Sequence, residues 1–97
     1  MKKYKLIISN QAILDLNEIW LYIATDSTVA ADKFIDLLYE KCELLKNMPE
    51  AGRKRDELLP GIRSLVVYNY IVFYRKKENC VEIIRILNGY RDVNSIF

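Results

Sequence analysis

The sequence contains no histidine and only two cysteines, Cys42 and Cys80, among its 97 residues. Zinc sites and acid–base catalysis near neutral pH rely heavily on these two residue types. No Cys-x-x-Cys pair is present, so the sequence indicates neither a zinc site nor a disulfide framework, and we expect no metal and no cofactor. Both cysteines fall within periodic apolar segments, which predicts that they are small buried hydrophobic residues.

Long hydrophobic runs are also missing. Lysines precede Leu6, Ile7 and Ile8, as at the start of a signal peptide, but three apolar residues fall short of the roughly 7–15 required. No segment approaches the roughly 20 apolar residues of a membrane helix. The chain is 52% hydrophobic and 29% charged, which is typical of a globular protein. We therefore expect one cytoplasmic domain spanning residues 1–97, with no membrane partner.

The net charge is small, at +2, but the charged residues are unevenly distributed. Residues 1–50 carry 6 basic and 8 acidic side chains, whereas residues 51–97 carry 9 basic and 5 acidic ones. The second half is therefore where an anionic partner would bind. Its surplus is smaller than that of a dedicated nucleic-acid-binding surface, so direct nucleic-acid binding is not expected.

Two helices are predicted in the first half, after a short strand at Lys3–Ile8. Ser9 or Asn10 can cap a helix over Gln11–Ala24, and a second helix follows over Val29–Asn47. Together they form an antiparallel hairpin. In the first helix, the apolar face comprises Ala12, Leu16, Ile19 and Ile23, and the opposite face comprises Gln11, Asp15, Glu18 and Tyr22.

Three strands are predicted in the second half, at Ile62–Val67, Tyr70–Arg75 and Cys80–Leu87. Tyr68-Asn69 marks a tight turn between the first two, so consecutive hairpins give an antiparallel meander. On the last strand, simple alternation places on one side Val81, Ile83, Arg85 and Leu87. Both of its sides are largely apolar, which predicts a central strand. The fold class is α+β, in the order β-α-α-β-β-β, with the helical hairpin packed on an antiparallel sheet.

Each helix also carries a pair of leucines outside its main apolar face. Leu14 and Leu21 are seven residues apart, as are Leu37 and Leu44, so each pair forms a thin second stripe. Two interpretations remain open. The stripes close the helical hairpin itself, or they form a docking surface for an amphipathic helix of a partner protein.

Several motifs occur in an order that resembles a known family. They are A-x-x-D-L-x-x-I at residues 12–19, P-x-x-G at residues 49–52, E-L-x-P-G-I-R at residues 57–63, and the strand sequences Y-I-x-F-Y and V-x-I-I-R-I-L before N-G-Y-R-D at residues 88–92. Over nearly the whole chain, this pattern resembles the ParE/RelE toxin superfamily of bacterial type II toxin–antitoxin systems, and more closely its ParE branch.

The resemblance implies a β-α-α-β-β-β fold and a cognate antitoxin, ParD-like or of another class, whose C-terminal segment wraps the toxin in a hetero-oligomer. The resemblance implies that the leucine stripes form the antitoxin-binding surface. Two toxic activities occur in the superfamily: RelE-like members cut mRNA in the ribosome, and ParE-like members inhibit DNA gyrase. A third class has lost toxicity and only binds its antitoxin.

Metal-free RNA cleavage needs a base, cations that stabilise the phosphate, and an acid. RelE-like enzymes use Lys, Arg and Tyr for these roles, with an arginine on the strand where this chain has Ile71. Isoleucine cannot hold a phosphate, so a nuclease would depend on a substitute catalytic cluster of Arg63, Arg85, Tyr90 and Arg91.

ParE-like toxins typically end in His-Gly-basic-Arg-Asp, and residues 88–92 keep the Gly, Arg and Asp but lose the His and one basic residue. We expect a growth-arresting toxin that inhibits gyrase by binding. Its expected target face is an exposed tail, Tyr90–Phe97, together with basic strand residues, which makes the candidates Arg63, Arg75, Tyr90, Arg91 and Phe97. For Arg91, pairing with Asp92 or with a carbonyl at the sheet edge is an equal structural alternative.

Overall fold

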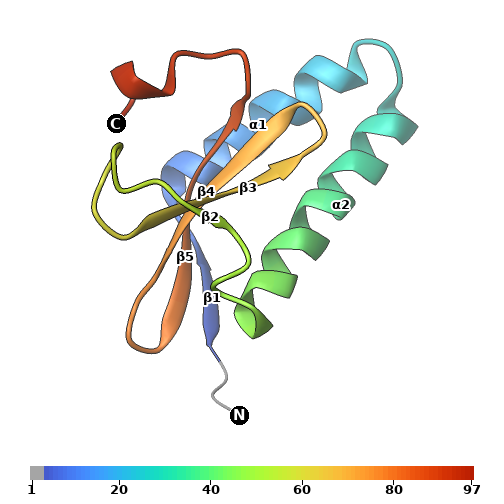
Figure 1. Cartoon of the computed structure of the whole chain (residues 1–97). Coiled ribbons are helices and arrows are strands. Elements are labelled where there is room, and N and C mark those ends of the chain that lie inside the picture. Colours follow the sequence, from blue (N-terminus) through green and yellow to red (C-terminus); the bar gives the residue numbers. More distant parts are fainter. Residues whose placement is uncertain (1–3) are drawn as a thin grey trace.

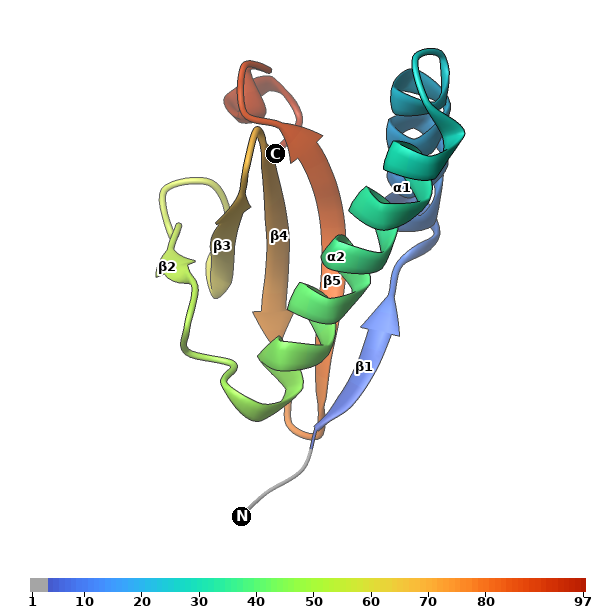
Figure 2. The ribbon, with the colours of Figure 1, turned by 90° about the vertical axis from the view of Figure 1, so that its right-hand side faces the viewer.

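The computed structural model describes residues 4–97, so Lys3 of the predicted first strand lies outside the described range. The elements in chain order are β1 (Lys5–Ile8), α1 (Asn10–Ala24), α2 (Thr28–Asn47), β2 (Arg53–Lys54), β3 (Ile62–Val67), β4 (Tyr70–Lys76), β5 (Cys80–Asn88) and the 3-10 helix η1 (Val93–Ser95). Both helices lie on one side of the sheet (Figures 1 and 2). The predicted α+β class and helical hairpin are confirmed.

The sheet has five strands in the order β1-β5-β4-β3-β2, and it is mixed, not antiparallel throughout. β1 runs parallel to β5, from the pair Lys5 and Cys80 to the pair Ile8 and Ile83. Tight turns make β4 antiparallel to both of its neighbours, β3 and β5, as predicted. No such turn joins β1 to β5, because the helical hairpin and three strands separate them, and the local pattern left that direction undetermined. β5 is central, as expected.

The helix starts follow from side-chain capping. Ser9 Oγ accepts a hydrogen bond from Ala12 N at 3.1 Å and donates one to Ile84 O at 2.8 Å. Ser27 Oγ accepts from Ala30 N at 3.1 Å at the start of α2. Each serine satisfies an amide that has no partner within its helix, and Ser9 also fixes α1 to β5.

A β-bulge in the β4–β5 pair changes which side chains face the helices. Tyr74 pairs with Ile83 but Phe73 pairs with Arg85, so Ile84 is the extra residue on β5. Beyond the bulge, Ile86 joins the helix-side core, whereas Leu87 packs on the other side of the sheet. The expected simple alternation along this strand is therefore wrong after Ile83, because one inserted residue reverses the faces.

The irregular segment after α2 is fixed by one buried phenol. Tyr74 Oη accepts from Gly52 N at 2.7 Å and donates to Pro49 O at 2.9 Å. A Cβ on residue 52 would lie 2.5 Å from Tyr74 Oη and 2.9 Å from Ser64 O. Glycine is thus required at position 52, because the backbone there lies too close to Tyr74 and Ser64 for a side chain. This close approach allows β2 to pair with β3.

Both cysteines are buried and free, as predicted. Burial raises the pKa of the Cys42 thiol from 9.0 to about 12, and the Glu43 carboxylate adds to this shift. Because the folded-state pKa is the higher one, this contribution to stability is complete below pH 9 and is lost as the pH rises towards about 12. Over that window, we expect this thiol to lower the free energy of unfolding by about 1.4 kcal/mol per pH unit.

Urea denaturation at successive pH values from 8 to 11 would measure this loss. The matched control is Cys42→Ala, which removes the ionising group and should make the decline with pH shallower by the contribution of one proton. An identical decline in both proteins would contradict the assignment of the effect to Cys42.

Candidate functional site

Two predicted target-binding residues already make contacts within the fold: Arg63 on β3 and Arg75 on β4. Arg63 Nη1 donates to Gly52 O at 2.8 Å and to Glu50 O at 3.3 Å, which supports the segment beside β2. Arg75 lies 3.4 Å from Glu82 Oε1 on the neighbouring strand, where Lys77 also binds that carboxylate at 3.1 Å. These two arginines therefore position backbone and cross-strand neighbours, and contact of either one with a target stays a prediction.

Arg85 is held in a two-pronged ion pair with Asp15 of α1. Its Nε and Nη2 donate to the two carboxylate oxygens, each at 2.9 Å, and Ile86 N donates to Asp15 Oδ2 at 2.9 Å. Hydrogen bonding to Asp15 raises the pKa of the Arg85 guanidinium above its ordinary value. Three donors thus satisfy one buried carboxylate, and the arrangement ties α1 to β5 across the bulge.

The burial of Asp15 corrects the predicted helical face. Asp15 is 5% exposed although it was placed opposite the apolar residues. The sequence did carry a signal: Asp15 lies three residues after Ala12 and four before Ile19, a spacing that places all three on neighbouring rows of the helix. What the sequence could not show is the partner, because Arg85 comes from β5.

The Asn88-Gly89-Tyr90-Arg91-Asp92 motif turns the chain away from β5. Gly89 N donates to Asn69 O at 2.7 Å, and a Cβ on Gly89 would lie 3.3 Å from that same oxygen. Asp92 caps η1 by accepting from Asn94 N at 3.1 Å. Tyr90 is 90% exposed, and within residues 4–97 the Arg91 side chain makes no hydrogen bond or ion pair. The alternative in which Arg91 pairs with Asp92 is therefore wrong.

The end of the chain is less exposed than expected. The ring centroids of Phe97 and Phe73 are 4.9 Å apart, and Val93 and Ile96 also pack against the cluster of Ile62, Phe73 and Leu87. The tail thus lies at one end of the sheet and covers part of the face that the helices leave open (Figure 1). Tyr90 and Arg91 project from it, whereas Phe97 is partly buried, which corrects the expectation of a free tail.

A cleft lined by aromatic side chains lies beside Tyr90. We call it the aromatic cleft and define it by five rings from five parts of the chain: Tyr22, Phe34, Tyr68, Tyr70 and Tyr90. Its volume is about 370 Å³. Phe34 stands in the middle, with ring centroids 5.5 Å from Tyr70 and 6.3 Å from Tyr68. Of these five residues, only Tyr90 was among the predicted site residues, although the turn at Tyr68-Asn69 was predicted.

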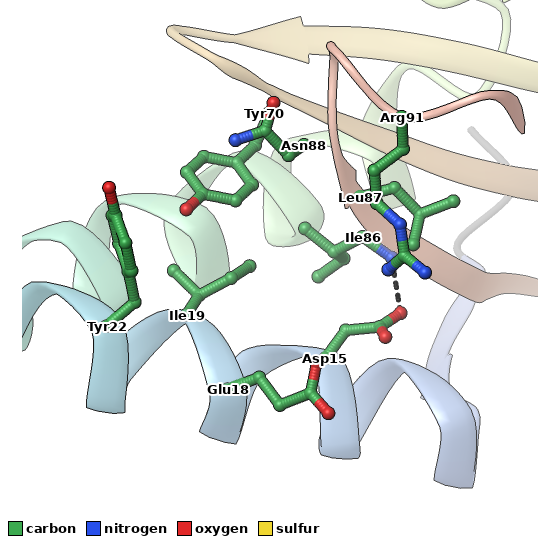
Figure 3. Close-up of a pocket in the computed structure, with 9 residues that line it drawn as sticks. All are labelled: Asp15, Glu18, Ile19, Tyr22, Tyr70, Ile86, Leu87, Asn88 and Arg91. Atoms are coloured by element: carbon green, nitrogen blue, oxygen red, sulfur yellow. Dashed lines mark hydrogen bonds between the residues drawn. The ribbon is translucent and has the colours of Figure 1, made fainter.

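An adjoining cavity of about 270 Å³ shares Tyr22, Tyr70 and Asn88 with the aromatic cleft. Figure 3 shows Arg91 above Asp15 at one end of this cavity and Tyr22 with Tyr70 at the other. Burial raises the pKa of the Tyr70 phenol above its ordinary value, and Tyr22 adds to the shift. Tyr70 therefore stays neutral at physiological pH, able both to donate and to accept a hydrogen bond.

Tyr68 is held in an unusual backbone conformation. Its φ is +54°, and within residues 4–97 it is the only residue other than glycine with a positive φ. A two-residue hairpin turn with positive φ at its first position favours glycine there. A bulky residue in this region costs about 1 kcal/mol or more, yet the ring is 79% exposed and gains little from packing.

The chain is similar to known proteins both in sequence and in fold. Residues 6–93 match the family described as the ParE toxin of the type II toxin–antitoxin system, parDE. The chain belongs to the ParE toxin family. Among solved structures, one described as the chromosomal ParDE TA system from P. aeruginosa shares the fold, with a TM-score of 0.76 and 24% identity. That match covers 89% of this chain and 96% of the other. No curated protein matches the chain.

Three of the four stripe leucines in this ParE-family chain are exposed. Leu14 and Leu21 are 55% and 63% exposed on α1, so they do not close the helical hairpin, and Leu44 is 41% exposed on α2. Leu37 is half-buried against the main core and lines a cavity of about 290 Å³ with Lys41, Val66, Val67 and Tyr68. The hairpin-closing interpretation therefore fails for Leu14 and Leu21, and a docking role for the stripes stays a prediction.

Residues 4–97 contain no group of three or more Cys, Asp or Glu side chains placed to hold a metal ion. Neither helix in this range is long and apolar enough to cross a membrane.

Proposed function

We propose that this ParE-family toxin inhibits DNA gyrase by binding to it, with no covalent chemistry of its own. The observation that carries the proposal is that two of the candidate arginines already contact other groups of the fold. Arg63 and Arg85 are each engaged with groups of the fold, and Arg63 lines a different cavity from the one beside Arg91. The exposed functional groups that remain, Tyr90 and Arg91, suit recognition of another protein.

A ribosome-dependent mRNA endonuclease is the second candidate function. It would need a base, an acid and cations around one phosphate. Of the substitute cluster, Tyr90 and Arg91 make no side-chain hydrogen bond or ion pair within residues 4–97, but Arg85 is held by Asp15 through its Nε and Nη2. Ile71 stands on β4 in the place where RelE-like enzymes carry an arginine. The arrangement therefore favours binding over catalysis.

Neutralisation by a cognate antitoxin completes the proposal. The exposed leucines Leu14, Leu21 and Leu44, with the half-buried Leu37, offer apolar anchors on the outside of the helical hairpin. An amphipathic segment of the antitoxin would bury them in a hetero-oligomer. Both partners would act in the cytoplasm, where gyrase is found.

The deciding experiment places purified protein in a gyrase supercoiling assay beside a ribosome-programmed mRNA-cleavage assay. Loss of supercoiling with intact mRNA is the expected result. Cleaved mRNA with active gyrase would overturn the proposal in favour of the nuclease. If neither occurs, and expression without the antitoxin does not arrest growth, the chain is a non-toxic antitoxin-binding relative.

Single substitutions at the exposed residues should weaken this inhibition. We expect Tyr90→Ala and Arg91→Ala each to raise the concentration needed for half-inhibition about tenfold, since truncating an interface anchor commonly costs more than 1 kcal/mol. Both side chains are exposed, so thermal stability should not change. Arg53→Ala, at an exposed arginine of β2, is the matched control. Equal inhibition by all three variants would remove Tyr90 and Arg91 from the target face.

A further inference from the structure

The aromatic cleft has a chemical character that gyrase inhibition alone does not explain. Eight residues line it, and none of them carries a charge: Tyr22, Ile23, Phe34, Tyr68, Asn69, Tyr70, Asn88 and Tyr90. Three of the five rings are largely exposed, with exposed fractions of 72% for Tyr22, 79% for Tyr68 and 90% for Tyr90. Three exposed rings that come from separate segments and gather around one cavity are typical of an interaction site.

The electrostatics around these rings favour a cation. The faces of aromatic rings carry partial negative charge and attract ammonium and guanidinium groups. The last turn of α1, which supplies Tyr22 and Ile23, contains no basic residue, so the partial negative charge at the helix end is not compensated there. Glu18 lines the adjoining cavity, and its carboxylate makes no hydrogen bond or ion pair within residues 4–97.

No cation from residues 4–97 makes a cation–π contact with a ring of the aromatic cleft, although Lys41 shares a neighbouring cavity with Tyr68. In the described part of the chain, the cation–π contacts are those of Arg55 with Phe73 and of Lys76 with Tyr4, both away from the aromatic cleft. Arg91 lies at the far end of the adjoining cavity, above Asp15, and not over Tyr22 or Tyr70 (Figure 3). The rings are thus available to a cation from outside the chain.

Backbone strain supports a role for the ring of Tyr68. Glycine would relieve the positive φ at this position, and the exposed ring contributes little to the core. A strained residue that presents a bulky side chain to solvent is better explained by contact with a partner than by folding.

We propose that the aromatic cleft binds an arginine or lysine side chain from the protein target of this toxin. The cation would lie against the rings of Tyr22, Tyr68 and Tyr70, with the Glu18 carboxylate nearby. Tyr90 and Arg91 would contact the same partner at the rim of the cleft. This inference rests on the proposed function, in which the toxin acts by binding a protein.

A first experiment tests the chemistry of the aromatic cleft without any target. The full chain is titrated with the capped peptide Gly-Arg-Gly and with the capped control Gly-Gln-Gly, while NMR follows the tyrosine ring signals. We expect saturable shifts at Tyr22, Tyr68 and Tyr70 with the arginine peptide, with a dissociation constant on the order of 1–10 mM, and none with the glutamine peptide. Equal responses to both peptides would overturn the inference.

Two other occupants would give distinct results in the same titration. Shifts at these rings that depend on protein concentration without any peptide would assign the aromatic cleft to a second copy of the chain. Tighter binding of adenosine monophosphate than of the arginine peptide would assign it to a nucleobase. Either result overturns the inference.

A second experiment uses the gyrase supercoiling assay. Tyr22→Leu and Tyr68→Gly should each raise the half-inhibiting concentration about tenfold, and Tyr39→Leu, at a 42% exposed tyrosine on α2 outside the aromatic cleft, should leave it unchanged. Tyr68→Gly should melt at or above the temperature of the parent, which separates lost binding from lost folding. Unchanged inhibition by both cleft variants would overturn the inference while gyrase inhibition stands.

The two proposals can also fail separately. If the parent protein does not inhibit gyrase but the arginine peptide still binds the rings, the proposed target is wrong and the cation preference of the aromatic cleft is retained.

Discussion

Asp15→Ala is expected to lower the free energy of unfolding by about 3 kcal/mol, the low end of the cost of breaking a buried ion pair. The substitution removes the carboxylate that accepts from Arg85 twice and from Ile86 N once, each at 2.9 Å. It leaves a guanidinium whose side chain is only 21% exposed without its counter-charge. Urea denaturation, followed by circular dichroism, measures the loss.

A nearby carboxylate provides the control for this prediction. Glu18→Ala, one turn along α1, removes an exposed carboxylate that makes no ion pair in residues 4–97, and should change stability by less than about 0.5 kcal/mol. The double variant Asp15→Leu/Arg85→Met should recover only part of the loss, because an apolar pair avoids the unpaired charge but still leaves the buried Ile86 N without its acceptor. A loss below about 1 kcal/mol in Asp15→Ala would mean that water satisfies Arg85 instead.

Truncation after Gly89 is expected to lower the free energy of unfolding by about 3 kcal/mol, from three half-buried apolar side chains at about 1 kcal/mol each. Removal of the tail takes away Val93, Ile96 and Phe97, which pack against the cluster around Phe73. That cluster would become an exposed apolar patch and promote association. Loss of toxicity in the truncated chain would therefore not identify the target face by itself.

The truncation must be compared with substitutions in the full chain. Tyr90→Ala and Arg91→Ala remove the exposed side chains and keep the packed end of the tail, so they should lose inhibition without losing stability. Removal of Phe97 alone should cost about 1 kcal/mol, because one ring contact at 4.9 Å is lost. A truncated chain as stable as the parent would show that the tail does not protect the sheet face.

Much of the fold was predictable because it follows from local patterns. Ser9 and Ser27 cap helices whose apolar residues recur with helical period, and the turn at Tyr68-Asn69 fixes the pairing of β3 with β4. The end of β3 at Val67 agrees with the prediction to the residue. Family membership was also visible, since it rests on the order of motifs along nearly the whole chain.

The candidate site was less predictable because its parts come from distant segments. Arg85 was a candidate cation for a nuclease, but α1 places Asp15 beside it. Tyr22 is exposed, as its helical face predicted, but the sequence did not show that it lines a cavity with Tyr70 of β4. Phe97 was expected in an exposed tail, but its ring packs against that of Phe73. Each of these contacts joins residues far apart in the sequence, so no local period or spacing contains it.

The sequence by itself determined the helices, the β3–β5 meander, the buried cysteines and the family, because short-range patterning, turns and caps specify these features. Only the tertiary structure decided the parallel β1–β5 pair, the reversal of faces beyond Ile83 and the aromatic cleft. The physical reason is that a strand's direction and a bulge are set by how the layers pack together. The side chains that meet around a cavity are selected in the same way.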